Sequence, residues 1–484
     1  MSLIVNYPNN LRSIAYSTDG SSMIVPPKKV FLPSSILEVK AIILGSDKVV
    51  IRGGGSGFVG GSLVNNDDSV ILSTARLSEV IDLDRTRMTI TVGSGMTLSS
   101  LNDFLSDYDL EFPLLPLNHS TTTVGSMVAL NSSGFRSFKY KRVYDWVEGL
   151  SVVDSKGQLL EVGKLDLNNF LGMEGITGII VSVKLKLIKR VRTRSMTFYR
   201  ADNISKLVEL TRRLKSDPNI SSVLLFGKDS SVLLSLSNDY HLVVEFEDLS
   251  GEIKGSNYLE KYSLVLDVHD SLVSKGYSRV VDPKIFLDKV SIITEFLESN
   301  HVPHFFEFGS GTVYSYYHND NTTYARIHYL FKNIRRLRGG ITSGFGIGSL
   351  SKEFLDDVEK KLALRIKVRC DGINKFNPGV LVDFVDNKFD NPVGTFDSYD
   401  SSESVDDKVH LNVSLDSIND KMYNDMVVEK YDDYFVDNTA IEENTDGSVV
   451  DDVDGSNINF KRNFSSLKDH DKNTDDSGVD DVTG

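Results

Sequence analysis

Cysteine is nearly absent from this sequence, since Cys370 is the only one among 484 residues. A lone cysteine cannot form an intramolecular disulfide, and it cannot supply a four-thiolate iron–sulfur cluster or a multi-thiolate zinc site. Any iron–sulfur relay must therefore belong to another polypeptide. Arg and Lys residues beside Cys370 could activate a thiol, but we favour a half-buried structural role for it.

Long basic and long apolar runs are also missing. Asp and Glu exceed Lys and Arg by 68 to 53, and no basic stripe is available to neutralise phosphates, so nucleic acid is not an expected partner. No segment approaches the apolar length that spans a bilayer, and the amino terminus lacks the pattern of a signal peptide. We expect a cytoplasmic protein without a transmembrane segment, or one that is peripheral to a membrane through a partner.

The chain does contain enough apolar material for more than one core, with 40% hydrophobic residues. Short β-rich runs, glycine clusters and short helices predict an α+β domain over residues 1–192. Helices and strands alternate without glycine-rich loops over residues 193–340, which predicts a second domain suited to form a cap. Residues 385–484 are rich in Asp, Ser and Asn, which predicts a disordered acidic tail, either a solvating extension or a docking segment for a basic partner.

The strongest local feature is RGGGSGFVGG at residues 52–61, directly after the strand-like KVVI. Repeated glycines let several N–H groups point at one anion, and phosphate is the expected guest. Gly55, Gly57 and Gly60 also satisfy the dinucleotide-binding pattern G-x-G-x-x-G, with Asp82 further along the chain. We reject that interpretation because the following SLVNNDDSV is too short and turn-rich for the crossover helix of a parallel unit.

Two further segments combine small residues with backbone N–H donors. Residues 116–134, PLNHSTTTVGSMVALNSSG, lack the G-K-[ST] of a P-loop, so a nucleoside triphosphatase is disfavoured. Residues 172–180, GMEGITGII, have glycines between apolar residues before a strand, as expected where a backbone packs against a flat ring system. Each segment alone is more typical of a structural turn.

Taken in order, these segments resemble the FAD-binding domain of the p-cresol methylhydroxylase and vanillyl-alcohol oxidase superfamily. The most similar branch contains the glycolate oxidase flavin subunit and the D-lactate dehydrogenases, and alkyl-dihydroxyacetonephosphate synthase is a more distant relative. The resemblance also includes YSTDGS, LPSSILEVKAII, VYDWVEGLSVVDSKG, GGITSGFGIGSLSKEF and IKVRCDGINKFNPG. It implies an α+β protein with a two-subdomain FAD-binding fold over residues 1–192, a cap over 193–340 and a segment 341–384 that returns to the first domain.

The resemblance also implies which residues bind FAD. Family members with covalent flavin use a histidine in the first loop, and Ser56 stands at the matching position here, so non-covalent FAD is expected. His119, the only nearby imidazole, is expected to be a hydrogen-bonded loop residue. The implied cofactor-binding residues are Arg52, Gly53, Gly54, Gly55, Ser56, Gly57, Pro116, Thr122, Thr123, Val124, Gly125, Ser126, Gly134, Glu174, Gly175, Gly178, Ile179 and Asn377.

The sequence departs from the hydroxyacid branch at its catalytic histidines. That branch carries a Glu-His pair before Gly-Ile-Gly, where this chain has Gly344 and Phe345. The candidates left for acid–base catalysis are Glu307, as a base if desolvated, with Tyr314 or Tyr316 as polar groups, although packing roles are at least as expected. No metal site is expected, because the spacing of the neighbouring histidines does not match a zinc site.

These observations predict an FAD-dependent dehydrogenase that transfers hydride from a small hydroxyacid or alcohol to FAD and on to a separate acceptor. By resemblance, that acceptor is a quinone-linked or iron–sulfur partner. Two alternatives remain: a non-catalytic FAD-binding subunit of a multi-subunit oxidoreductase, and a transferase like the alkyl-dihydroxyacetonephosphate synthases. The substrate and the oligomeric state do not follow from the sequence.

Overall fold

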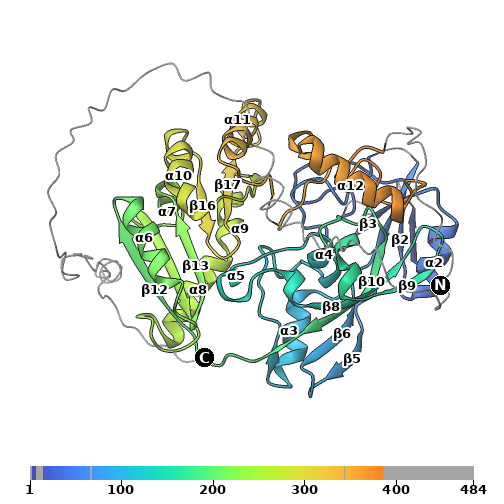
Figure 1. Ribbon diagram of the computed structural model, residues 1–484, viewed down its shortest axis with the longest axis horizontal. Helices are drawn as coiled ribbons and strands as arrows, with labels where there is room; N and C mark the ends of the chain where they lie inside the picture. Colours follow the sequence, from blue (N-terminus) through green and yellow to red (C-terminus); the bar gives the residue numbers. More distant parts are fainter. Residues whose placement is uncertain (1–2, 7–14, 66–67, 343, 385–484) are drawn as a thin grey trace, which may run out of the picture.

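The computed structural model describes residues 3–6, 15–65, 68–342 and 344–384. Figure 1 shows two units side by side, one built on the first 190 residues or so and one built on a six-stranded sheet. The predicted acidic tail, residues 385–484, lies outside the described residues. Helices and sheets are mixed in both units, in agreement with the predicted α+β class.

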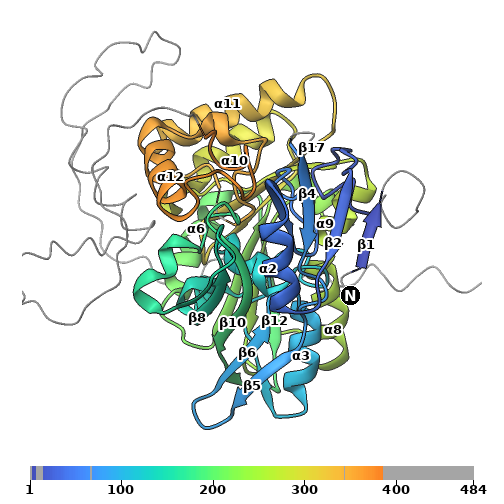
Figure 2. The ribbon, with the colours of Figure 1, turned by 90° about the vertical axis from the view of Figure 1, so that its right-hand side faces the viewer.

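The first unit begins with a four-stranded sheet in the order β1 (Leu3–Asn6), β2 (Lys29–Leu32), β4 (Ser69–Ser73) and β3 (Lys48–Arg52). β4 pairs in parallel with β2 and β3. Helix α2 (Ile36–Leu44) begins at Ser35, whose side chain accepts a hydrogen bond from the N–H of Glu38. Its buried side chains pack with residues of this sheet and of the next one, and Figure 2 shows the helix between β2 and β10. The chain leaves β3 directly into the first glycine-rich loop, which brings that loop to the carboxyl end of a buried strand.

The second sheet is antiparallel, in the order β5 (Val80–Asp84), β6 (Thr89–Gly93), β10 (Ile179–Lys186), β8 (Val147–Val153) and β9 (Leu159–Val162). Helix α3 (Leu98–Ser106) covers it and is capped by Thr97, with Leu98, Leu101 and Leu105 buried as the sequence predicts. Helix α4 (Val124–Ala129) follows the second loop and starts against the end of β6. The short pair β7 (Leu110–Glu111) and β11 (Ile188–Lys189) closes this part, and α5 (Ser137–Tyr140) points toward the second unit.

The second unit is an antiparallel sheet of β12 (Ser195–Ala201), β14 (Tyr240–Phe246), β13 (Ile220–Phe226), β16 (His304–Glu307), β17 (Thr312–Tyr317) and β15 (Arg279–Val281). One face buries α6 (Ile204–Leu214), α10 (Val290–Ser299) and α11 (Thr323–Arg336). The other face packs against α7 (Lys228–Leu233), α8 (Gly255–Leu266) and α9 (Val268–Ser274). That second face also contacts aromatic residues of the first unit, so the two units share an apolar interface.

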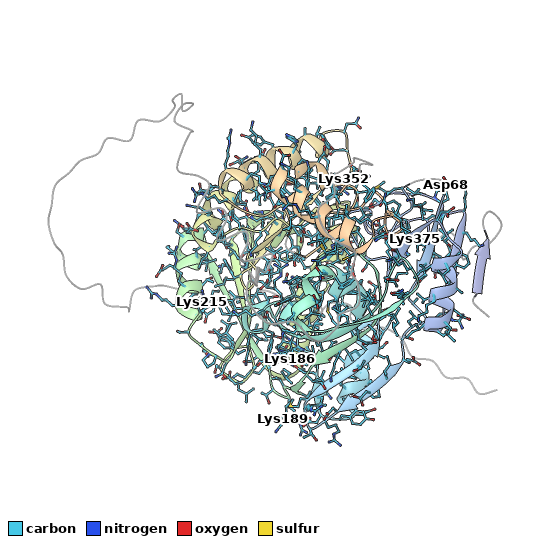
Figure 3. All side chains as sticks on the ribbon, turned by 45° about the vertical axis from the view of Figure 1, so that its right-hand side comes forward. Asp68, Lys186, Lys189, Lys215, Lys352 and Lys375 are labelled. Carbon is cyan, nitrogen blue, oxygen red and sulfur yellow. The ribbon has the colours of Figure 1, made fainter. Side chains whose placement is uncertain are left out.

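The chain returns to the first unit after α11. Helix α12 (Asp357–Cys370) lies beside the four-stranded sheet in Figure 1, and Lys375 is beside that sheet in Figure 3. The Lys375 ammonium donates to the carbonyl of Ile43 at 2.7 Å, and the N–H of Asn377 donates to the carbonyl of Val49 at 2.8 Å. This segment therefore runs parallel to β3 from its start toward the first glycine-rich loop.

A buried ion pair joins the two units. Arg136, just before α5, donates to the carboxylate of Glu245 in β14 at 2.9 Å, and both side chains are under 10% exposed. The hydroxyls of Tyr258 and Tyr262 bond to the same pair. Because both charges are paired and further hydrogen-bonded, the contact fixes the geometry of the interface.

Candidate functional site

One cavity is lined by most of the residues that the sequence singled out as cofactor-binding. We call it the main cavity; it holds about 1210 Å³ of space, open solvent included. Its walls come from the loop after β3, the segments before and after α4, the segment before β10, one strand of the second unit and the returning chain. Of the predicted cofactor-binding residues, it is lined by Gly53, Gly55, Ser56, Gly57, Pro116, Thr122, Gly125, Ser126, Glu174, Gly175, Gly178 and Asn377.

The first loop and the second loop meet backbone to backbone. A Cβ at Gly53 would lie 2.6 Å from the Thr123 hydroxyl oxygen, and one at Gly54 would lie 1.9 Å from the carbonyl oxygen of Thr121. Gly55 adopts a φ of +70°, in the left-handed region that favours glycine. Glycine is therefore required here for close approach, and the loop exposes peptide groups to the cavity in place of side chains.

Arg52 supports the first loop from behind. The residue is 5% exposed, and its guanidinium donates to the carbonyls of Ala15 and Thr18 at 2.9 and 2.8 Å. It does not line the main cavity, although the sequence placed it with the cofactor-binding residues. Its charge is thus used to hold the amino-terminal segment against the loop.

The second loop is ordered by a capping box. Thr123 accepts from the N–H of Ser126 at 3.3 Å, and Ser126 accepts from the N–H of Thr123 at 3.1 Å. This fixes the start of α4 and brings Thr122, Gly125 and Ser126 to the cavity wall. Like Arg52 and Gly54, four other predicted residues support the cavity wall without lining it. Thr123 and Val124 belong to the capped turn, Gly134 packs closely against Leu115, and Ile179 lies in the core under α2.

The third segment is held by a buried carboxylate. Glu174 accepts from the N–H groups of Ile347 and Gly348 at 2.6 and 2.7 Å. Burial raises the pKa of Glu174 to about 7, although the two N–H donors act in the opposite direction. Asn377 donates to the Glu174 carbonyl at 2.6 Å and accepts from the N–H of Ile51 at 2.7 Å. Glu174 and Asn377 thus hold three distant segments in one wall.

The wall on the second-unit side is aromatic and hydroxylated. Tyr314 and Phe345 lie with their ring centroids 5.4 Å apart, and Ser132 and Ser133 line the same part. Asp282 accepts from the N–H groups of Gly344 and Phe345 at 2.7 and 2.9 Å, so it fixes the loop that stands where the hydroxyacid branch has its Glu-His pair. Sequence reasoning noted Phe345 only as a replacement and missed Asp282 and Ser133, because nothing in their local pattern points to a cavity.

The three predicted catalytic residues lie on two paired strands, but they do not all reach the main cavity. Tyr314 lines the main cavity, whereas Glu307 and Tyr316 do not. Glu307 is fully buried and accepts from the N–H groups of Gly309 and Ser310 at 2.7 and 2.9 Å, and burial raises its pKa to about 7. Tyr316 is fully buried near His269 and Phe305. Strand alternation places Tyr314 and Tyr316 on one face, and only the first reaches the cavity.

The walls of the main cavity fit FAD. Peptide groups of glycine loops, where an added Cβ would meet backbone, suit a diphosphate, and the apolar side chains of Ile51, Phe170 and Ile180 suit a planar ring. Among the described lining residues there is no lysine, arginine, histidine or cysteine. The diphosphate would therefore be met by neutral N–H and hydroxyl donors.

Comparison with known proteins agrees with this site. Residues 27–163 match the family described as "FAD binding domain", so the chain carries an FAD-binding domain of the p-cresol methylhydroxylase type. The D-lactate dehydrogenase of Archaeoglobus fulgidus is 24% identical over 433 residues, which cover 76% of this chain and 96% of that protein. A D-2-hydroxyglutarate dehydrogenase from Xanthomonas citri pv. viticola is 30% identical over 186 residues, 36% of this chain and 39% of its own length. The glycolate oxidase subunit GlcD of Bacillus subtilis is 25% identical over 47% of this chain and 51% of its own length.

The fold is shared with a solved structure, an alkyldihydroxyacetonephosphate synthase, with a TM-score of 0.60 at 14% identity over 78% of this chain and 82% of that one. The predicted FAD cofactor and the resemblance to FAD-linked dehydrogenases and oxidases are thus confirmed. The chain spans only about two fifths to one half of the length of two of these relatives. Across the described ranges, no helix has the length and apolarity to cross a membrane, and no cluster of three or more His, Cys, Asp or Glu side chains could hold a metal ion.

Proposed function

We propose that this protein is an FAD-dependent oxidoreductase that takes hydride from the alcohol carbon of a small hydroxyacid or alcohol, whose hydroxyl proton leaves to solvent as the carbonyl forms, and passes the electrons to a separate acceptor. The observation that carries the proposal is a single cavity that is lined both by the glycine-rich loops and by Tyr314. FAD, when bound, supplies the group that accepts the hydride. The similarity to named dehydrogenases and oxidases supports the reaction class.

We propose that FAD is held non-covalently by the loops after β3 and before α4. Glu174 and Asn377 support the part of the wall that residues 172–180 form. Ser56 lines the cavity where covalent family members have histidine, and among the described lining residues no histidine or cysteine is available for a covalent bond. The second unit, from about residue 193 to 340, acts as a cap over this cavity, because β17 contributes Tyr314 to its wall. Residues 341–384 complete the first unit.

Tyr314 is the residue best placed to meet the substrate. Burial raises the pKa of Tyr314 well above its ordinary value, so its phenol keeps its proton at neutral pH and donates a hydrogen bond. Its role is therefore to orient the substrate oxygen, and Phe345 beside it excludes water. The Glu307 carboxyl accepts hydrogen bonds from the N–H groups of its own turn. We assign it an indirect role, because its charge contributes to the raised pKa of Tyr314 on the neighbouring strand.

An FAD-binding subunit without its own catalytic step, or a transferase similar to the alkyldihydroxyacetonephosphate synthases, is the second candidate. It is favoured by the absence of imidazoles from the described lining residues and by the shared fold. The acceptor in the first proposal is a quinone-linked or iron–sulfur partner, in keeping with a relative named as a subunit of glycolate oxidase. A cytoplasmic or membrane-peripheral location is proposed with it.

The test is the visible spectrum of the purified full chain, recorded before and after anaerobic addition of glycolate, D-lactate, D-2-hydroxyglutarate and a panel of alcohols. Oxidised-flavin bands that one substrate bleaches support the oxidoreductase. Flavin bands that no compound bleaches favour the second candidate. A protein that neither carries FAD nor takes it up on reconstitution contradicts both.

A further inference from the structure

Charge is divided unevenly along the chain. The chain has 68 Asp and Glu and 53 Lys and Arg; residues 385–484 hold 26 and 8 of these, which leaves 42 and 45 for residues 1–384. The last 100 residues therefore carry a formal net charge of −18, and the rest of the chain carries +3. A segment this acidic is attracted to any cationic surface on the chain to which it is tethered.

Cations gather on the part of the chain that returns to the first unit. Residues 326–384 hold twelve Lys and Arg against six Asp and Glu. Helices α11 and α12 lie next to each other there, joined by the ion pair of Arg335 with Glu359 (Figure 1, Figure 2). We call the exposed cations of these helices and of the residues that end them the basic face: Lys332, Arg336, Arg338, Lys361, Arg365 and Arg369.

The charge of the basic face is not neutralised within the described ranges. No carboxylate there forms an ion pair with any of its six members. Most carboxylates of the same segment pair with other cations: Asp356 and Glu359 with Arg335, Asp371 with Lys367, and Asp383 with Lys352. Glu353 and Asp357 remain, so the basic face keeps most of its positive charge.

Three of these cations form one stripe along α12. Lys361, Arg365 and Arg369 follow one another at intervals of four residues, so their side chains lie on one face of the helix. Arg369 also donates to the side chain of Asn169, which is a neutral group. The opposite face of the helix packs on the protein through Ala363 and Lys367, which are buried. With a rise of about 1.5 Å per residue, α12 is about 21 Å long and the stripe covers about 12 Å of it.

The described residues end beside the same helix. Val382 packs in the apolar cluster that contains Ala363 of α12, and the Asp383 carboxylate accepts from the Lys352 ammonium at 2.5 Å. Residues 397–407, DSYDSSESVDD, follow soon after in the sequence and hold five carboxylates without a lysine or arginine. The twelve residues between Phe384 and this acidic run can span about 40 Å at about 3.3 Å per residue, which exceeds the length of α12.

We propose that the basic face is an intramolecular docking surface for the acidic tail of this chain, with residues 397–407 bound along the stripe of Lys361, Arg365 and Arg369. The tether favours this occupant over other polyanions, because it holds five carboxylates near the stripe at an effective concentration on the order of mM. The tail thereby shields the exposed cations of α11 and α12 from nucleic acids and anionic lipid surfaces. The inference is independent of the proposed function, since it involves neither the flavin nor the main cavity.

The first test couples lysines to carboxylates in the purified full chain with a zero-length carbodiimide, and mass spectrometry identifies the joined peptides. Lys361 should join residues 397–407, whereas Lys215, which Figure 3 labels and which is exposed at the end of α6, should not. A mixture of isotope-labelled and unlabelled chains shows whether the joined peptides come from one molecule.

The variant Arg336→Glu/Arg365→Glu reverses two unpaired cations of the basic face. It should lower the yield of Lys361 crosslinks roughly tenfold, the loss expected when several exposed charge pairs are removed together. The matched control is Arg212→Glu/Arg213→Glu, which makes the same charge change at two exposed arginines of α6 and should keep the yield.

The second test is the radius of gyration from small-angle X-ray scattering as NaCl rises from about 0.1 M to about 1 M, which shortens the Debye length from about 10 Å to about 3 Å. Screening releases a docked tail, so the radius of the parent chain should grow. A free acidic tail repels itself and contracts when it is screened, so the radius of Arg336→Glu/Arg365→Glu should shrink. A parent that contracts with salt, Lys361 crosslinks that are missing or join two different molecules, or an unchanged yield in this variant overturns the inference.

Discussion

The side-chain amide of Asn377 donates a 2.6 Å hydrogen bond to the backbone carbonyl of Glu174, 203 residues away in the chain. Through its oxygen, the same amide also accepts from the N–H of Ile51. One buried side chain therefore holds the carboxyl-terminal segment, the third cavity segment and strand β3 together.

Replacing Asn377 with alanine should loosen this junction. Asn377 is 2% exposed, so the substitution leaves a buried carbonyl and a buried N–H without partners, which costs about 1–3 kcal/mol each. We expect a lower urea midpoint and weaker FAD retention on gel filtration. The control is Asn300→Ala at an exposed helix end, and an equal loss in both variants would contradict the assigned role.

The contact between the first two loops predicts the effect of one added methyl group. In Gly54→Ala the new Cβ would lie 1.9 Å from the Thr121 carbonyl oxygen, so the loops must separate. We expect the purified variant to contain little FAD, measured as the ratio of flavin to protein absorbance. Gly163→Ala is the control, because a Cβ there meets nothing within 4 Å, and it should retain full flavin.

Tyr314 and Tyr316 give a direct comparison of two sequence-predicted catalytic residues. Tyr314→Phe removes the hydroxyl of a tyrosine that lines the cavity and should lower the rate of flavin reduction by roughly 10²-fold, the loss typical of one hydrogen-bond donor. Tyr316→Phe removes a buried hydroxyl that does not line the main cavity and should leave that rate within a few-fold of the parent. Anaerobic stopped-flow reduction measures both, and the reverse order of effects would show that the wrong tyrosine has been assigned.

The Glu307 carboxyl predicts a specific pH dependence of stability. Its pKa rises from 4.5 to about 7 on folding because of burial, so between these values the folded state binds more protons than the unfolded state. Stability contributed by this group is fully present below pH 4.5 and declines, by up to about 3 kcal/mol, as the pH rises to 7.

Other buried groups act in the opposite direction, since burial lowers the pKa of His269 and His304 to about 4. We therefore expect the signal in the difference between the parent and Glu307→Gln, which cancels the shared histidine contribution. The parent should lose stability relative to the variant as the pH rises from 4.5 to 7 in urea titrations. A stability difference between the parent and Glu307→Gln that does not change with pH would refute the prediction. The control is Glu209→Gln, which changes a half-exposed side chain on α6.

Local structure was predictable where neighbouring residues decide it. Thr97 and the spacing of Leu98, Leu101 and Leu105 are enough to predict α3, because a cap and an apolar stripe are properties of one segment. The sequence SLVNNDDSV was enough to exclude a crossover helix after the first loop, and among the described residues between β3 and β4, 53–65 and 68, the structure has no helix. The glycine-rich loops by themselves predicted only an anion such as phosphate, and the family resemblance that the ordered segments carry predicted FAD correctly.

The site residues were less predictable, because lining a cavity is a property of packing. Arg52 and Ile179 lie in the right segments, yet one faces the amino-terminal residues and the other the core under α2. Glu307 is a carboxyl that could act as a base, but its oxygens accept hydrogen bonds from its own turn and do not face the main cavity. No local pattern could distinguish these outcomes.

The sequence by itself therefore determined the class of fold and an anion-binding loop, since glycine conformations, caps and apolar periodicity act over a few residues, and its resemblance to a known family added FAD as the cofactor. Only the tertiary structure decided that Tyr314 reaches the cavity while Tyr316 does not. That difference depends on segments more than a hundred residues apart. It exists only after the two units have buried their common apolar face.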